Sequence, residues 1–298
     1  MAYFLQQAAN GLFPAAIYGL LAYGYTLTFA VTRRANLAHG ALFALLGQIT
    51  ILATVFSYRI FRLELWAALI FGIALAAAFA WVISQLVSRH VFEPLARQSP
   101  NAMIAATLAL MIVFLELGRI ASDARDFWLP PMLAAPATLL SSGGIAITLT
   151  AIQLLAIAAS LAALGAANLF IRRSAFGKHW NALAQDPLAA SLCGVDPKST
   201  LIRTVLVSSG LTLIAAVLAA VYYGNVSFGE GLTYGLKILL ISAAGGFASP
   251  LVSAIGAAGV AIAESLWTGY FPADWRDGVI YGALVLLLVL RRSGKLPV

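Results

Sequence analysis

The hydrophobic positions of this chain form long blocks separated by short polar breaks, rather than the one-sided or alternating patterns of water-facing helices and strands. A helix of about 20 apolar residues crosses a ~30 Å hydrocarbon core. The candidate blocks are 12–32, 38–57, 65–87, 101–120, 145–170, 201–222, 230–245, 251–267 and 277–291. Because 230–245 and 251–267 are short and rich in glycine, we expect about eight or nine transmembrane helices. The pattern predicts an all-α polytopic membrane protein with a single domain, residues 1–298.

Composition excludes several classes of protein. The 298 residues are 62% hydrophobic and 10% charged, whereas soluble domains carry about 25% charged residues. The net charge is +7, but the basic residues lie at the ends of apolar blocks, so we expect membrane anchors and no nucleic-acid partner. Cys193 is the single cysteine, and His39, His90 and His179 are scattered. We therefore expect neither a metal ion nor a cofactor.

The basic residues also predict an orientation, because lysine and arginine favour the cytoplasmic side of a membrane. If the polar segment 172–199 is cytoplasmic, twelve basic residues lie inside: Arg33, Arg34, Arg89, Arg97, Arg172, Arg173, Lys178, Lys198, Arg203, Arg291, Arg292 and Lys295. Five then lie outside: Arg59, Arg62, Arg119, Arg125 and Arg276. Lys237 falls within a block. We expect the N-terminus outside and the C-terminus in the cytoplasm.

The longest polar passage, residues 172–199, separates two apolar blocks near the middle of the chain. Asp186–Pro187 and Asp196–Pro197 each have an N-cap residue followed by proline at the first helical position. Gly194 stands where a helix starting at Pro187 is expected to end. The pattern predicts helices over about 177–185 and 187–193, with one apolar stripe formed by Trp180, Leu183, Ala184, Leu188, Leu192 and Cys193. Such a pair of helices either lies in the lipid headgroup layer or docks into a groove of a soluble partner.

The same passage resembles a known family. "FGKHWNALAQDPLAASLCGVDP" is similar to the cytoplasmic loop of permease subunits of branched-chain amino-acid ABC importers, the hydrophobic amino-acid uptake family. The residues that match the pattern of this loop are Gly177, Ala184, Asp186, Pro187, Ala189, Ala190, Gly194 and Val195. The segments 18–47, 92–100 and 235–257 also resemble the family, and Asn36, Ala38, His39 and Gly40 match its N-[FL]-A-H-G signature. The resemblance covers nearly the whole chain.

The resemblance implies a non-catalytic transport subunit in a bacterial inner membrane. Its coupling loop, with Trp180 beside the matching residues, would dock into a cleft of a cytosolic ATP-binding subunit, and the importer would contain two such subunits. A second permease subunit, forming a heterodimer, a periplasmic substrate-binding protein and membrane lipid are the other implied partners. No G-x-x-x-x-G-K-[ST] phosphate loop occurs in the chain, so we expect that it hydrolyses no ATP and is not an enzyme.

Polar and glycine positions inside the blocks suggest where a substrate passes. The candidate residues of the translocation path are Asn36, His39, Gly40, Asn225, Lys237, Gly245 and Gly246. For His39 and the glycines, helix capping and close packing are the alternative roles. Lys237 either lines the path or extends its amine to the membrane surface. Glu116 and Glu264 are expected at the interface.

Two further features bear on the substrate and the architecture. Where the family has A-A-V-L-G-G-x-G-S, this chain has "LISAAGGFAS", with Phe247 and Ala248 at the second glycine pair. This departure leaves open urea, short amides or aromatic acids in place of branched-chain or other hydrophobic amino acids. An ion-coupled secondary carrier is the alternative from another class. Asn36 and Asn225 each follow a long block and precede a block with glycine, which suggests an inverted repeat.

Overall fold

The structure, a computed structural model, describes residues 2–96, 98, 100–133, 135–142, 145–245 and 249–291. Its elements are α1 (Ala2–Asn10), α2 (Leu12–Thr32), α3 (Ala38–Ile60), α4 (Leu65–Val87), a π-helical turn (Ser88–Phe92), α5 (Glu93–Ala96), α6 (Pro100–Ala121), β1 (Pro136–Ser142), β2 (Ile145–Thr150), α7 (Ala151–Arg173), α8 (Ala175–Gln185), α9 (Pro187–Leu192), α10 (Pro197–Tyr223), α11 (Glu230–Ala244), α12 (Pro250–Tyr270), a 3-10 turn (Ala273–Trp275) and α13 (Arg276–Arg291). The predicted polytopic helical protein is confirmed.

Seven helices of the described residues are long and apolar enough to cross a membrane. They correspond to α2, α3, α4, α6, α7, α10 and α12, with α1 continuing into α2 and α4 continuing through the π-helical turn into α5. The remaining two predicted spans are the shorter helices α11, with 15 residues, and α13, with 16 residues. At 1.5 Å per residue they measure roughly 22–24 Å, short of a ~30 Å core. The count of eight or nine spans stays a prediction.

The predicted span 145–170 begins too early in the sequence. Residues 145–150 form strand β2, which pairs antiparallel with β1, and helix α7 begins only at Ala151. The sequence "IAITLT" is rich in β-branched residues, which favour strands. Thr150 and Gln153 then form a capping box, in which the Thr150 hydroxyl accepts a hydrogen bond from Gln153 N and Gln153 Oε1 accepts one from Thr150 N. The apolar block therefore contains a strand and a helix.

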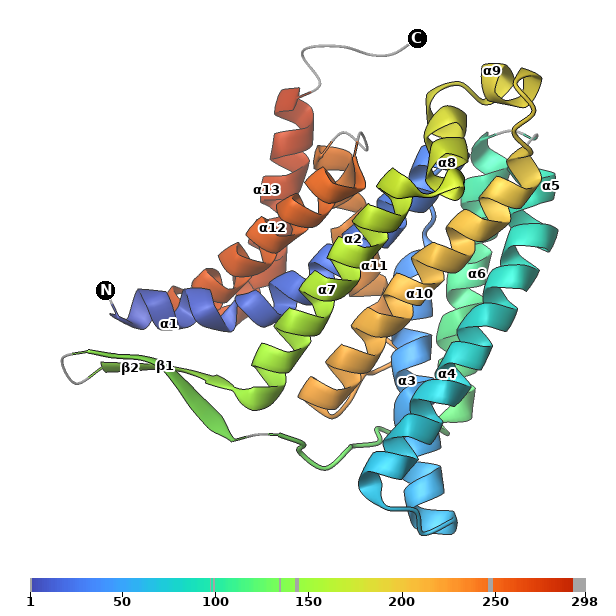
Figure 1. The fold of residues 1–298 in the computed structure, drawn as a ribbon. Helices are drawn as coiled ribbons and strands as arrows, with labels where there is room; N and C mark the ends of the chain where they lie inside the picture. Colours follow the sequence, from blue (N-terminus) through green and yellow to red (C-terminus); the bar gives the residue numbers. More distant parts are fainter. Residues whose placement is uncertain are drawn as a thin grey trace.

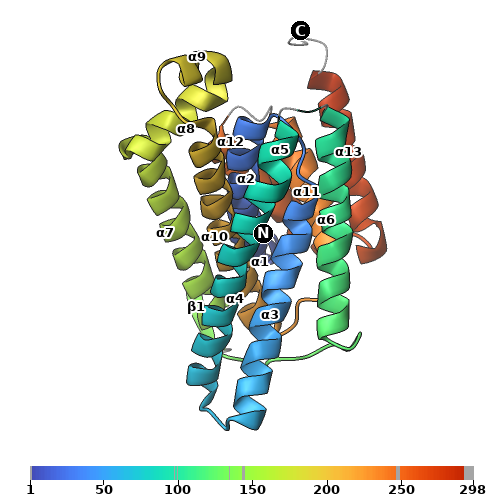
Figure 2. The same cartoon turned by 90° about the vertical axis from the view of Figure 1, so that its right-hand side faces the viewer.

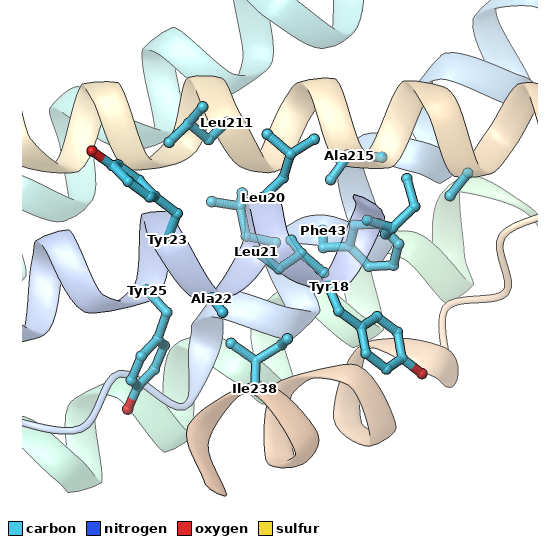
Figure 3. Close-up of a cluster of buried hydrophobic side chains, with 14 of the residues drawn as sticks. Tyr18, Leu20, Leu21, Ala22, Tyr23, Tyr25, Phe43, Leu211, Ala215 and Ile238 are labelled. Atoms are coloured by element: carbon cyan, nitrogen blue, oxygen red, sulfur yellow. The ribbon is translucent and has the colours of Figure 1, made fainter. Parts of the chain in front are cut away.

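Helix α2 lies at the centre of the bundle. Nearly every residue from Phe13 to Thr28 is buried, on all sides of the helix. The hydrophobic core surrounds it with residues from α3, α10, α11 and α12. Figure 3 shows the α2 side chains near Phe43 of α3, Leu211 of α10 and Ile238 of α11. A helix that is apolar all round is buried or faces lipid. Here the protein itself covers it.

Helices α4, α6, α7, α12 and α13 carry the outward apolar surface. Large apolar side chains are exposed on them: Ile70, Phe79, Trp81, Ile112, Leu117, Leu161, Ile255 and Leu286. In a soluble protein such a surface would be unstable in water, but lipid tails cover it in a membrane. Figures 1 and 2 show α8 and α9 at one end of the bundle and the turn between α3 and α4 at the opposite end. We name these the α8–α9 end and the α3–α4 end.

Candidate functional site

Helices α8 and α9 are set by local hydrogen bonds. Ser174 begins α8, and its hydroxyl accepts a hydrogen bond from Gly177 N at 3.0 Å. Asp186 begins α9, where Oδ1 accepts hydrogen bonds from Leu188 N at 2.9 Å and Ala189 N at 3.0 Å. Asp196 caps α10 in the same way, and both prolines occupy the first helical turn. Gly194 has φ +85°, the left-handed conformation expected after a helix. The two predicted short helices are present.

Helix α8 is fixed to the rest of the bundle by two kinds of hydrogen bond. The Trp180 indole Nε1 donates to the Leu27 carbonyl oxygen of α2 at 3.1 Å, and Trp180 itself is buried. The Arg33 guanidinium, just beyond the end of α2, donates to the carbonyl oxygens of Ala184 and Gln185 at the end of α8. Helix α8 is therefore joined directly to the central helix.

Helix α9 presents apolar side chains that nothing in the described chain covers. Leu188 is 71% exposed and Leu192 is 81% exposed. Cys193 is exposed at the end of the helix, whereas Ala190 is buried against its own chain. The predicted single stripe is therefore wrong: Trp180 and Leu183 face the bundle and are buried, while Leu188 and Leu192 face away from it.

The structure gives packing roles to three predicted path residues. Asn36 Oδ1 accepts a hydrogen bond from Ala38 N at 3.1 Å at the start of α3. His39 is buried, and its Nε2 lies 3.0 Å from the Leu21 carbonyl oxygen of α2. Gly40 lies where α3 crosses α11: a Cβ there would come closer than 3.0 Å to backbone atoms of Gly231 and Gly235. Glycine lets the two backbones approach.

The other predicted path residues are spread over the structure. Asn225 is half-buried in the connection between α10 and α11, and Gly245 directly follows α11. Gly246 lies outside the described residues, as do Phe247 and Ala248. Neither Asn225 nor Gly245 lines the cavity around Lys237.

Lys237 is at the centre of a charge cluster in which Lys237 and Glu264 are buried and Arg276 and Asp277 are partly exposed. Its Nζ lies 3.0 Å from Glu264 Oε1 of α12 and 3.0 Å from Asp277 Oδ1 of α13. Glu264 Oε2 accepts a hydrogen bond from the Tyr18 hydroxyl of α2 at 2.8 Å, and Arg276 Nε donates to Asp277 Oδ1 at 3.0 Å. The Lys237 side chain is only 3% exposed, so it does not extend to the membrane surface. Glu264 is buried within the protein as well.

These charged residues line a cavity of about 390 Å³. Its walls come from α2, α11, α12 and α13, with Tyr223 at the end of α10. By contrast, Glu116 pairs with Arg119 on the exposed surface of α6, and its place at the membrane interface stays a prediction. Sequence reasoning singled out Lys237 but missed Tyr18, Arg276 and Asp277 as its neighbours.

A second cavity, of about 920 Å³, lies at the α8–α9 end. It is lined by Tyr23 and Arg33 of α2, Arg172 of α7, Trp180 of α8 and Pro250 of α12. Helices α2 and α12 thus border both cavities. Between the cavities the two helices pack closely through small residues, where a Cβ at Gly19 would lie 3.6 Å from the Ala254 carbonyl oxygen.

Comparison with known proteins places the chain in a family. The family model described as "Branched-chain amino acid transport system / permease component" matches residues 7–289. The chain is 27% identical over 299 residues to the high-affinity branched-chain amino acid transport system permease protein LivH of Salmonella typhimurium, covering 99% of this chain and 96% of that protein. It is 26% identical over 300 residues to BraD of Pseudomonas aeruginosa, a permease protein with the same description, with the same coverage.

A solved structure, PsaBC from Streptococcus pneumoniae in complex with Fab, aligns with 96% of this chain and 90% of that chain, at 16% identity and a TM-score of 0.42. The family model spans almost the entire chain, from α1 to α13. This protein therefore belongs to the family of permease components of the branched-chain amino acid transport system.

Proposed function

We propose that the chain is the membrane-spanning subunit of an ATP-binding-cassette importer for branched-chain and other hydrophobic amino acids. Family membership and the names of LivH and BraD support this proposal. The observation that carries it is the α8–α9 pair, a helical unit that is fastened to the central helix and exposes Leu188 and Leu192 at its tip. An uncovered apolar pair on a helix is suited to a groove of a soluble partner.

In this proposal α9 is the coupling element. It inserts into a cleft of a cytosolic ATP-binding subunit, and closure of two such subunits on ATP pulls α8. The coupling residues proposed from the sequence divide into groups: Gly177 and Trp180 join α8 to the bundle, Asp186 and Pro187 start α9, and Ala189 lies on its exposed surface. Because Trp180 and Arg33 tie α8 to α2, the pull reaches the helix that borders both cavities.

The proposed arrangement places the α8–α9 end in the cytoplasm of a bacterium and the α3–α4 end outside the inner membrane. A periplasmic binding protein delivers the substrate to the outer end. A second permease subunit of similar fold completes the pore as a heterodimer. The path follows the seam between α2 and α12, from the cavity around Lys237 to the cavity beside Trp180. Both cavities border this seam, and small residues such as Gly19 lie along it.

A cysteine placed on α9 tests the coupling element. Cys193 is exposed, so it is first replaced by serine. In this Cys193→Ser background, Ala189→Cys is expected to crosslink to the ATP-binding subunit in inside-out vesicles. Arg62→Cys, in the exposed turn between α3 and α4, is the control and is expected to react only with an impermeant maleimide added from outside. Reaction of the Ala189→Cys variant with external maleimide would refute the assignment.

The buried Lys237 cluster favours a second candidate, an ion-coupled carrier, because such carriers use buried ionisable residues. The two candidates differ in their energy source. An ATP-binding-cassette importer requires ATP and a binding protein. An ion-coupled carrier works in liposomes that contain this chain alone and an ion gradient.

A further inference from the structure

The cavity around Lys237 contains matched charges of both signs. Lys237 and Arg276 supply two positive charges, and Glu264 and Asp277 supply two negative charges. Lys237 and Glu264 are buried, whereas the side chains of Arg276 and Asp277 are 39% and 41% exposed. Each member lies within 3.0 Å of an opposite charge, so the buried Lys237 and Glu264 are paired. Glu230, another carboxylate that lines the same cavity, is exposed. The four-residue cluster is neutral as a whole.

The cluster draws its members from several helices. Lys237 is roughly 10 Å along α11 from Glu230, and Glu264 is roughly 9 Å from the end of α12 at Tyr270, whereas Arg276 and Asp277 are the first two residues of α13. The cavity of about 390 Å³ is within the usual range for small-molecule sites, roughly 300–1,000 Å³. It is therefore large enough to hold a small solute.

Both carboxylate oxygens of Glu264 have a partner within the protein. Oε2 accepts a hydrogen bond from the Tyr18 hydroxyl, and Oε1 lies 3.0 Å from Lys237 Nζ in an ion pair. A ligand ammonium at this carboxylate would therefore take the place of Lys237.

A zwitterion fits this chemistry better than an ion or a neutral amide. The carboxylate of the ligand can replace Glu264 or Asp277 beside Lys237. The ammonium of the ligand then pairs with the protein carboxylate that has been displaced. The number of paired charges is kept, so no buried charge is left alone. A cation or an anion would leave one charge of the four-residue cluster uncompensated.

Part of the wall can contact an apolar side chain. Tyr18 and Tyr234 meet edge to face with ring centroids 5.6 Å apart, and Pro14 and Ala261 line the same cavity. The polar side chains of Thr233, Ser265 and Thr268 also line this wall. Aromatic and aliphatic walls beside a few fixed polar groups are the usual composition of a ligand site. The cavity thus combines charges for the α-carbon groups of an amino acid with a surface for its side chain.

We propose that this cavity is a transient binding site for the amino-acid substrate inside the permease, with Lys237 and Arg276 at its α-carboxylate and Glu264 and Asp277 at its α-ammonium. The site rests on the proposed function and adds that the permease itself selects zwitterions. Urea, short amides and acids without an amine would be poor ligands. Binding is weak, because the ligand must displace ion pairs that already satisfy most of the cluster.

Photolabelling of the complete importer in proteoliposomes tests the site, because a covalent label records weak binding. The probe is a diazirine analogue of leucine, and the labelled peptides are identified by mass spectrometry. Labels are expected within 14–18, 230–237 or 261–268, and excess leucine should suppress them. The diazirine acid without the amine is expected to give at least about tenfold less label, which corresponds to ~1.4 kcal/mol.

An isoelectric double variant, Lys237→Gln with Glu264→Gln, removes one charge of each sign and so avoids a lone buried charge. It is expected to lose the label and to raise the KM for leucine uptake, while ATP hydrolysis stimulated by the binding protein continues. Glu116→Gln with Arg119→Gln is the matched control, since it removes an exposed ion pair of the same type. This control is expected to label and transport as the wild type does.

The outcomes separate this proposal from the proposed function. A wild-type importer that takes up leucine but is labelled only elsewhere would overturn the site and leave the importer intact. Unchanged labelling in the isoelectric variant, or equal labelling by the acid without the amine, would overturn it too. An importer that takes up no hydrophobic amino acid would refute the proposed function and the site with it.

Discussion

Replacing Gly177 with alanine is expected to abolish transport while the long helices stay folded. A Cβ at this position would fall closer than 3.0 Å to the backbone of Ile171, near the end of α7. A backbone carbonyl cannot rotate away as a side chain can, so α8 has to move. That movement breaks the hydrogen bond between Trp180 and the Leu27 carbonyl oxygen. Uptake of labelled leucine by the complete importer measures the effect.

Gly165→Ala is the matched control for Gly177→Ala. Gly165 lies on the preceding helix, α7, and nothing comes within 4 Å of a Cβ placed there. This control is expected to transport normally. If Gly177→Ala also transports normally at an equal amount in the membrane, the junction between α7 and α8 does not carry the coupling movement.

Replacing Gly40 with alanine is expected to destabilise the bundle itself. A Cβ at Gly40 would approach the backbones of Gly231 and Gly235 closer than 3.0 Å, which forces α3 and α11 apart. Overpacking of this kind typically costs about 1–3 kcal/mol. We expect a smaller amount of folded permease in the membrane and a thermal transition several degrees lower in detergent, measured by fluorescence-detected size exclusion after heating.

The matched control for Gly40→Ala is Gly210→Ala, in the middle of α10, where nothing lies within 4 Å of a new Cβ. It is expected to leave stability unchanged or to raise it slightly, because alanine favours helices over glycine. Equal stability of Gly40→Ala and Gly210→Ala would show that the crossing of α3 and α11 is looser than the structure indicates.

Features that depend on neighbouring residues were predictable from the sequence. The limits of α9 and the start of α10 follow from Asp186, Asp196 and the prolines after them, because a cap bonds to amides two or three residues away. The long apolar blocks likewise gave most of the helices. In contrast, the early start at residue 145 was wrong, since hydropathy alone does not distinguish a buried strand from a helix.

Contacts between distant segments were not predictable in this way. Lys237 stood out as a charge in an apolar block, but its partners Glu264 and Asp277 are on other helices, and Tyr18 lies 246 residues before Glu264. Gly40 was found through a motif, yet its packing role depends on Gly231, far along the chain. The apolar stripe failed for the same reason: whether Leu183 or Leu188 is covered depends on where α8 packs.

Leucine uptake by proteoliposomes that contain the complete importer tests the coupling claim most directly. The wild type is expected to require ATP on the α8–α9 side and the binding protein on the other side. Leu188→Glu with Leu192→Glu places charges on the uncovered surface of α9 and is expected to lower uptake at least about tenfold. The double variant Leu188→Met with Leu192→Met is expected to take up leucine as the wild type does. Uptake that needs only an ion gradient, or that the glutamate pair leaves unchanged, would contradict the account.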